Sequence, residues 1–314
     1  MGAGPEDGGD RVVTPAVEDA TVETVLREGV ETLRAAGLAD ARASAEWLLA
    51  AQLGTGRFDV YLDTERPLTA AETARYRASV ARRARRQPLQ HILGFEDFHG
   101  LRLAVGPEVL IPRPETEGLV DWAVEILAER PAAAVADIGT GSGAIACALA
   151  SRLPQLRVLA ADCSSAALRI AGDNVRALGL ADRVTLLAGD LVAPLQDRGV
   201  AVDVIVANPP YLASGVIPTL PPEVSAHEPR LALDGGPDGM AVLRRIISGA
   251  PAVLVPGGRL LMEIGEDQAG PLASVMAAEG FAGIRSRRDL HGVERYIGGR
   301  WGLDMPPAPA PRSC

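Results

Sequence analysis

The sequence predicts an α/β protein in which a doubly wound, Rossmann-like sheet follows a small helical domain. From residue 133 onward, short apolar runs alternate with longer amphipathic segments, the pattern of strands and helices in a mostly parallel sheet. Before residue 87, apolar residues recur at helical spacing. The 314 residues, 47% of them hydrophobic, suffice for two domains or one large domain with a full core.

Three helices are expected near the N-terminus, and they define a helical domain over residues 17–86. The first covers residues 17–36, and the second runs to residue 53 with Asp40 as its cap. Thr69 and Glu72 form a capping-box pattern for a third helix that ends at residue 86. This domain carries no cofactor motif, so we expect it to recognise a substrate.

A hairpin linker is expected over residues 87–110, because residues 90–95 and 101–105 are short strand-like runs. Pro114 follows the linker and suits the first turn of a helix that continues to residue 129. Glu115 in that first turn complements the helix dipole.

The second domain is expected over residues 111–302, with strands and helices in alternation and an antiparallel hairpin at its C-terminal end. The expected strands are residues 133–138, 156–161, 184–187, 202–207, 259–264, 283–287 and 293–298. The expected helices between them are residues 143–153, 164–178, 238–250 and 267–279.

Composition argues against several other classes of protein. No apolar run approaches the ~20 residues of a transmembrane helix, and the N-terminus lacks an apolar signal region, so a cytoplasmic location is expected. Three scattered cysteines and four histidines without ligand spacing predict no metal site. A net charge of −9 makes nucleic acid an unlikely partner. Disordered tails are expected at residues 1–16 and 303–314.

Glycine, carboxylate and carboxamide groups follow four successive strands, at the edge where open α/β sheets bind ligands. The first strand ends in a G-x-G-x-G loop, which differs from the dinucleotide and phosphate-binding motifs. Asp162 can accept hydrogen bonds from ribose hydroxyls, and Asp190 can accept one from an adenine amino group. Together these groups predict S-adenosylmethionine bound across a class I methyltransferase sheet. The predicted cofactor contacts are Gly139, Thr140, Gly141, Gly143, Asp162, Asp190 and Asn208.

The tetrapeptide Asn208-Pro209-Pro210-Tyr211 is predicted to hold the methyl acceptor. Its prolines stop the preceding strand, which leaves the Asn208 side chain and adjacent carbonyls at the strand tip. A carboxamide and a rigid carbonyl can accept two hydrogen bonds from one planar NH2 group, and an aromatic ring can cover its face. Asn208, Pro209 and Tyr211 are therefore the candidate catalytic residues, while Pro210, Arg113, Glu115 and Glu228 are further candidates for contacting the substrate.

Residues 87–300 resemble the family of protein-(glutamine-N5) methyltransferases that act on peptide-chain release factors. The resemblance implies that residues 139–143, Asp162, Leu191 and Asn208 contact the cofactor and that the tetrapeptide contacts the methyl acceptor. The helical domain and hairpin linker also fit that family's layout. The similar segments are residues 87–94, 111–117, 139–143, 208–211, 228–233 and 235–239.

The sequence departs from this family beside the acceptor site. Ser225 and Ala226 stand where the family more often has Arg and Asp, and Cys163 replaces a usual aliphatic residue. Residues 212–236 form a long loop without clear periodicity, which is typical of a functional or a disordered segment. An alternative acceptor is therefore a free amino acid or small metabolite, such as the arginine guanidino group, whose charge Glu115 or Glu228 would neutralise. A third hypothesis is a nucleic-acid protein, such as an adenine-N6 methyltransferase.

Overall fold

The computed structural model describes residues 20–128, 130 and 133–302, so the tails predicted at residues 1–16 and 303–314 lie outside the described residues. The chain divides into two compact units, with the boundary between Ile92 and Leu93. In the part of the chain that the structure describes, no helix is both long and apolar enough to span a membrane.

The N-terminal unit contains three main helices, α1 (Val22–Ala35), α2 (Ala41–Leu53) and α3 (Ala70–Ala84), with a short 3-10 helix η1 (Phe58–Tyr61) after α2. The capping box predicted for α3 is present, with Thr69 and Glu72 bonded reciprocally to each other's backbone N–H. Asp40 stands at the N-cap of α2, but the prediction that its side chain caps the helix is wrong. Its carboxylate instead accepts hydrogen bonds from Ser44 at 2.6 Å and Arg83 at 3.1 Å.

The prediction of a strand over residues 90–95 is wrong, because this segment begins with the one-turn helix α4 (Leu89–Leu93). A short apolar run does not distinguish a strand from a helix turn. The decisive signals are Pro88, whose carbonyl accepts from Ile92, and Gly94, whose φ of 83° ends the helix. The hairpin follows, formed by strands β1 (Phe95–Phe98) and β2 (Leu101–Ala104) in antiparallel register.

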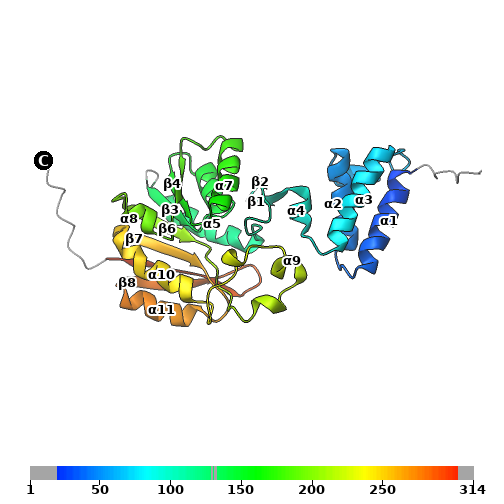
Figure 1. Cartoon of the computed structure of the whole chain (residues 1–314). Coiled ribbons are helices and arrows are strands. Elements are labelled where there is room, and N and C mark those ends of the chain that lie inside the picture. Colours follow the sequence, from blue (N-terminus) through cyan, green and yellow to red (C-terminus); the bar gives the residue numbers. More distant parts are fainter. Residues whose placement is uncertain (1–19, 129, 131–132, 303–314) are drawn as a thin grey trace, which may run out of the picture. The chain divides into compact units, whose positions relative to one another are not determined.

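The second unit is built on a seven-stranded sheet in the order β5-β4-β3-β6-β7-β9-β8, which confirms the predicted doubly wound sheet and its C-terminal hairpin (Figure 1). The first five strands in that order are parallel, whereas β9 is antiparallel to both neighbours. The strands are β3 (Ala134–Ile138), β4 (Arg157–Asp162), β5 (Val184–Ala188), β6 (Val202–Ala207), β7 (Leu254–Glu263), β8 (Phe281–Arg288) and β9 (Glu294–Trp301).

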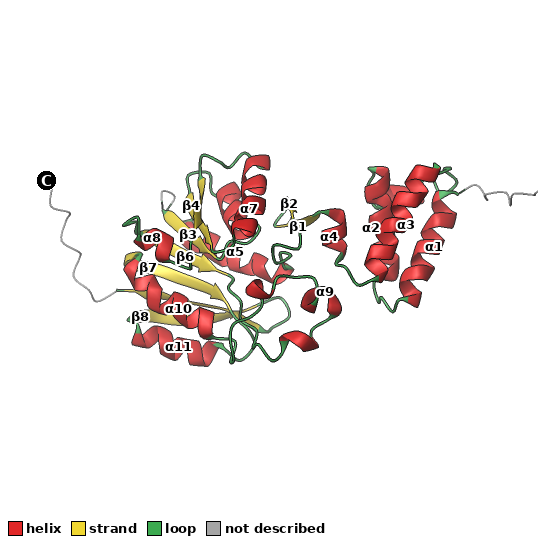
Figure 2. Ribbon diagram, in the orientation of Figure 1, coloured by secondary structure: helices red, strands yellow, loops and turns green. Residues whose placement is uncertain are grey.

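Helices cover both faces of this sheet, as Figure 2 shows. Alternate strand residues point to opposite faces, so that Val135 packs in the core beneath α5 and α6 while Ala136 packs beneath α10 and α11. The helices are α5 (Pro114–Leu127), α6 (Ala144–Arg152), α7 (Ser165–Ala177), α8 (Ala193–Gln196), α9 (Pro222–Ser225), α10 (Ala241–Gly249) and α11 (Ala269–Ala278). Three 3-10 turns complete the unit: η2 (Ile217–Thr219), η3 (Arg230–Ala232) and η4 (Ala250–Ala252).

Chain order reverses between β3 and β6, because β4 and β5 lie on one side of β3 while β6 and β7 lie on the other. A crevice opens at such a switch point, beyond the carboxyl ends of the strands. The predicted cofactor contacts and the tetrapeptide at residues 208–211 follow β3, β4, β5 and β6, so the topology brings them to this one edge.

Candidate active site at the carboxyl ends of the strands

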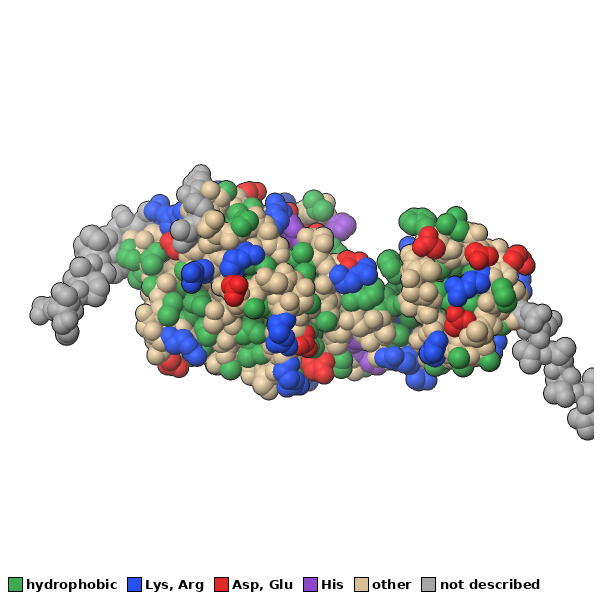
Figure 3. Space-filling view, turned by 90° about the horizontal axis from the view of Figure 1, so that it is seen from above, with side chains coloured by type: hydrophobic (Ala, Val, Ile, Leu, Met, Phe, Trp, Pro, Cys, Tyr) green, Lys and Arg blue, Asp and Glu red, His purple; other side chains and the backbone are tan. Residues whose placement is uncertain are grey.

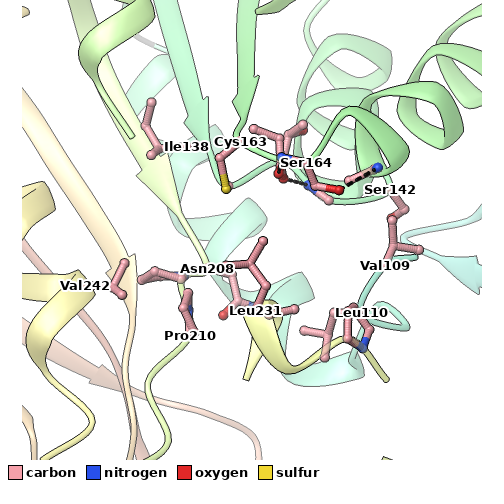
Figure 4. A pocket seen from close by; sticks show the side chains of 18 of the residues that line it. Val109, Leu110, Ile138, Ser142, Cys163, Ser164, Asn208, Pro210, Leu231 and Val242 are labelled. Atoms are coloured by element: carbon pink, nitrogen blue, oxygen red, sulfur yellow. Dashed lines mark hydrogen bonds between the residues drawn. The ribbon is translucent and has the colours of Figure 1, made fainter. Parts of the chain in front are cut away.

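A cavity lies at this edge of the sheet, and a smaller hollow adjoins it. Figure 4 shows the main cavity surrounded by residues of distant segments, including Val109, Cys163, Asn208 and Leu231. Of the predicted residues, the cavity is lined by Gly139, Thr140, Gly141, Asp162, Asp190, Leu191, Asn208, Pro209 and Pro210. The hollow is lined by Arg113, Asn208, Pro209 and Tyr211. Gly143, Glu115 and Glu228 line neither of the two.

The glycine loop presents backbone to the cavity at Gly139 and Gly141, because these two residues have no side chains. Gly139 and Gly141 have φ values of 74° and 56°, in the left-handed region. The buried carboxylate of Asp137 stabilises the loop. It accepts hydrogen bonds from the Thr140 hydroxyl at 2.6 Å and from the Ala146 N–H at 3.1 Å. Burial raises the pKa of Asp137 to about 7.

Gly143 is the N-cap residue of α6, and its contact with the cofactor stays a prediction. Its φ is 81°, and a Cβ there would lie 3.3 Å from the Cβ of Ala171 and 3.6 Å from the sulfur of Cys147. Glycine at this position therefore permits both the turn and the close packing of α6 against α7.

Asp162 is fixed by two backbone donors at the end of β4. One carboxylate oxygen accepts from the Gly141 N–H at 2.9 Å and the other from the Ser164 N–H at 2.8 Å. Each oxygen keeps a further lone pair, and the side chain lines the cavity. A carboxylate held in this way is a preorganised acceptor for a pair of neighbouring hydroxyl groups.

Asp190 lines the cavity and forms an ion pair with Arg245 of α10. The pair is exposed, with 57% of the Asp190 side chain and 58% of the Arg245 side chain accessible. Leu191 follows with a φ of 50°, which is strained for a residue with a side chain. That Asp190 accepts from an adenine amino group stays a prediction, and Arg245 is an additional candidate contact.

Asn208 stands where the cavity and the hollow meet, since it lines both. Its amide nitrogen donates to the Thr116 hydroxyl at 3.0 Å, and that hydroxyl donates to the Glu263 carboxylate at 2.7 Å. The other carboxylate oxygen of Glu263 accepts from the Tyr211 hydroxyl at 3.2 Å. Burial raises the pKa of Glu263 to about 7 and also raises the pKa of the Tyr211 phenol.

Arg113 forms a salt bridge with Glu228, at 2.6 and 2.7 Å to the two carboxylate oxygens. The Glu228 side chain is 1% exposed and the Arg113 side chain 32% exposed. Burial raises the pKa of Glu228, and the adjacent guanidinium acts in the opposite direction. The bridge ties the segment before α5 to the loop at residues 212–236.

Two family models match successive parts of the chain. A model described as "PrmC N-terminal domain" covers residues 24–94, and one described as "Methyltransferase small domain" covers residues 118–219. A release factor glutamine methyltransferase of Geobacter sulfurreducens is 43% identical over 291 residues, which are 92% of this chain and 100% of that protein. The chain belongs to the release factor glutamine methyltransferase family.

A second relative, the release factor glutamine methyltransferase of Moorella thermoacetica, is 45% identical over 83% of this chain and 91% of that protein. Among solved structures, the catalytic domain of hMettl16 in complex with an RNA hairpin is similar with a TM-score of 0.54 and 22% identity, covering 71% of this chain and 81% of that one. A methyltransferase from Pyrococcus furiosus has a TM-score of 0.50 and 18% identity over 65% and 90% of the two chains. These two structures show a shared methyltransferase fold and nothing further.

The structure brings three further side chains to the site of this family member that the sequence did not predict. They are Thr116, Glu263 and Arg245. Glu263 ends the apolar strand β7 at the same edge as the predicted site, so a charged residue at a strand tip was an available signal. Thr116 lies two residues after Pro114 in the first turn of α5, within the family-like segment at residues 111–117, but its residue type alone does not predict a role in the site. Arg245 reaches the cavity only through the packing of α10.

Proposed function

We propose that this protein transfers a methyl group from S-adenosylmethionine to the side-chain amide nitrogen of a glutamine in a peptide-chain release factor. The observation that carries the proposal is the position of Asn208 and Pro209, which line both the main cavity and the adjoining hollow. A methyl donor in the first and a glutamine side chain in the second would meet at this dipeptide. The relatives described above are named for the same reaction.

The residues of the main cavity fit S-adenosylmethionine. Gly139 and Gly141 offer backbone without side chains, and Asp162 is a fixed acceptor suited to ribose hydroxyls. Apolar side chains such as Ile138 and Val242 line the same space and suit an adenine ring. When bound, the sulfonium supplies a methyl group that is already activated for displacement. The protein's main contribution is then to align the acceptor nitrogen, which is worth up to ~7–11 kcal/mol.

An amide nitrogen is a poor nucleophile because its lone pair is delocalised into the carbonyl. The Asn208 Oδ1 and the Pro209 carbonyl would each accept one N–H of the substrate amide, which holds both hydrogens and directs the lone pair toward the methyl group. Proline suits this role because it offers a carbonyl without a competing N–H. No strong base is required if the proton leaves after transfer.

A guanidinium acceptor fits the site less well than an amide. A cation beside a sulfonium would need an unpaired carboxylate, and Glu228 is already paired with Arg113. Glu115 lines neither the cavity nor the hollow. None of the relatives described above is named for a small-molecule acceptor.

We further propose that the N-terminal unit contacts the release factor. Phe58 and Leu62 are 83% and 81% exposed in and after η1, and large apolar side chains so exposed favour a protein partner. Tyr61 beside them is 42% exposed. A nucleic-acid partner is disfavoured, since the net charge is −9 and arginine and acidic side chains are interspersed on the face shown in Figure 3.

The proposal is tested by labelled-methyl transfer measured in parallel on a purified release factor and on a panel of free amino acids that includes glutamine and arginine. Labelling of the release factor, with little or none on the free amino acids, is expected. Labelling of the free amino acids alone would overturn the assignment of the substrate. Asn208→Ala is the matched control, because it should bind the cofactor and transfer its methyl group slowly.

A further inference from the structure

The hydrogen bonds around Asn208 run in one direction. The Asn208 amide nitrogen donates to Thr116, and Thr116 donates to Glu263. An ionised carboxylate can only accept, and a threonine hydroxyl has one hydrogen. Once that hydrogen is given to Glu263, the Thr116 oxygen can only accept from Asn208.

This direction selects one of the two orientations of the Asn208 amide. With the nitrogen turned toward Thr116, Oδ1 points away from it and is available as an acceptor. Turning the amide over would place Oδ1 3.0 Å from a hydroxyl oxygen with no hydrogen to offer, and two acceptors at that distance repel. It would also present an NH2 group to the NH2 group of the substrate. The carboxylate of Glu263 therefore controls whether the oxygen or the nitrogen of the Asn208 amide points toward the substrate, although Thr116 lies between the two residues.

We propose that Glu263, in its ionised form, is a positioning residue for methyl transfer that orients the Asn208 amide through Thr116 and holds the Tyr211 hydroxyl directly. This inference rests on the proposed role of Asn208 as the acceptor for the substrate N–H. Glu263 acts through its neighbours, since it is 1% exposed and lines neither the cavity nor the hollow.

The environment of Glu263 supports a role other than stability. A buried carboxylate is costly even when it is hydrogen-bonded, and an uncharged side chain is often tolerated equally well in such a place. The charged and titratable groups that act on it are Arg295, which favours the ionised form, and Glu115, which opposes it, together with Tyr211 and Tyr296. Burial exceeds the attraction of Arg295, so that the pKa of Glu263 rises to about 7.

Protonation of Glu263 removes this control. The neutral carboxyl carries a hydrogen of its own, and if it donates that hydrogen to Thr116, the Thr116 hydroxyl turns toward Asn208 and favours the reversed amide. Ionised Glu263 predominates above its folded pKa, so turnover is expected to fall as the pH drops through about 7. A glutamine at this position cannot ionise, and it mimics the neutral acid at every pH.

The test compares Glu263→Gln with the wild-type full-length chain, using a release factor as substrate. The variant is expected to lose roughly tenfold to a hundredfold in kcat, less than the ~10²–10³ expected for a group that touches the transition state. Its affinity for S-adenosylmethionine should be unchanged, and the fall in kcat on the acid side should disappear. A purely structural role would move the melting temperature and the cofactor affinity without changing the shape of the pH profile.

Two further variants make the test specific. Thr116→Ser keeps the hydroxyl relay and should retain kcat, whereas Thr116→Val removes it at nearly constant volume and should match Glu263→Gln. Asp137→Asn removes the other buried carboxyl with a pKa raised to about 7 and should leave the acid-side fall in place. If Glu263→Gln fails to fold, Thr116→Val carries the same comparison.

The outcomes separate this inference from the proposed function. Wild-type kcat with an unchanged pH profile in Glu263→Gln, or an acid-side fall that disappears only in Asp137→Asn, would overturn the role of Glu263. Failure of the wild-type chain to methylate any release factor would instead overturn the proposed substrate. The Glu263 comparison would then be made on whichever amide or amine is labelled, because the relay orients Asn208 for any NH2 group.

Discussion

Replacing Arg113 by alanine should destabilise the methyltransferase unit by leaving Glu228 buried and unpaired. The Glu228 side chain is 1% exposed with Arg113 in place, so removing the guanidinium leaves a largely buried carboxylate without its cationic partner. Breaking a buried ion pair typically costs ~3–5 kcal/mol, and the lower value applies here because Arg113 is 32% exposed and the pair is partly screened. For a domain of roughly 150–250 residues, ~3 kcal/mol lowers the melting temperature by ~6–12 °C.

The stability that Arg113→Ala loses should increase as the pH rises. Burial already raises the pKa of Glu228, and removing Arg113 raises it further. A carboxyl whose pKa is higher in the folded state than in the unfolded state is best tolerated in acid, below its unfolded pKa, and stability is lost as the pH rises through the folded value. The variant should therefore lie close to wild type near pH 5 and well below it at pH 8.

Thermal unfolding of Arg113→Ala, Glu228→Gln and Arg113→Met with Glu228→Gln measures this directly. The double variant should recover most of the stability, because a neutral amide can be buried without a cationic partner. An equal loss for Arg113→Ala at both pH values, or no recovery in the double variant, would show that the pair does not hold the loop in the way described.

Three further predictions concern the site and its partner. Asp162→Ala should weaken S-adenosylmethionine binding at least tenfold in calorimetry, since each hydrogen bond to a charged acceptor is worth ~1.5–3 kcal/mol, and unchanged affinity would remove Asp162 from the site. Asn208→Asp should retain cofactor binding while kcat on the release factor falls, because the carboxylate would stabilise the sulfonium before transfer; near-normal kcat would reduce Asn208 to a turn residue. Phe58→Ser with Leu62→Ser should raise KM for the release factor and leave the cofactor affinity unchanged, and an unaltered KM would argue against recognition by the N-terminal unit.

The local pattern of apolar residues in the sequence was sufficient to predict the sheet and the residues at the ends of its strands. Alternating apolar runs fix the order of strands, and parallel strands place their carboxyl ends at one edge, so Asp162, Asp190 and Asn208 were brought to one cavity as expected. Local pattern was insufficient for α4, whose few apolar residues suit a strand and a helix turn equally.

Contacts between distant residues were not predictable from the sequence. Thr116 and Glu263 are 147 residues apart, and Arg113 and Glu228 are 115 residues apart. Each pair is made by the packing of separate segments, which no periodicity records. The hypothesis that Glu228 neutralises a cationic acceptor did not include its salt bridge with Arg113, because that pairing arises only in the folded chain.

The central claim is that one methyl group passes to the side-chain nitrogen of a glutamine in a release factor. Its most direct test is mass spectrometry of peptides from a release factor incubated with this protein and S-adenosylmethionine. Fragmentation should place a single added methyl group on a glutamine side chain, and Asn208→Ala should strongly reduce its yield. A methyl group on any other residue type, or an unmodified release factor after incubation with active protein, would contradict the account.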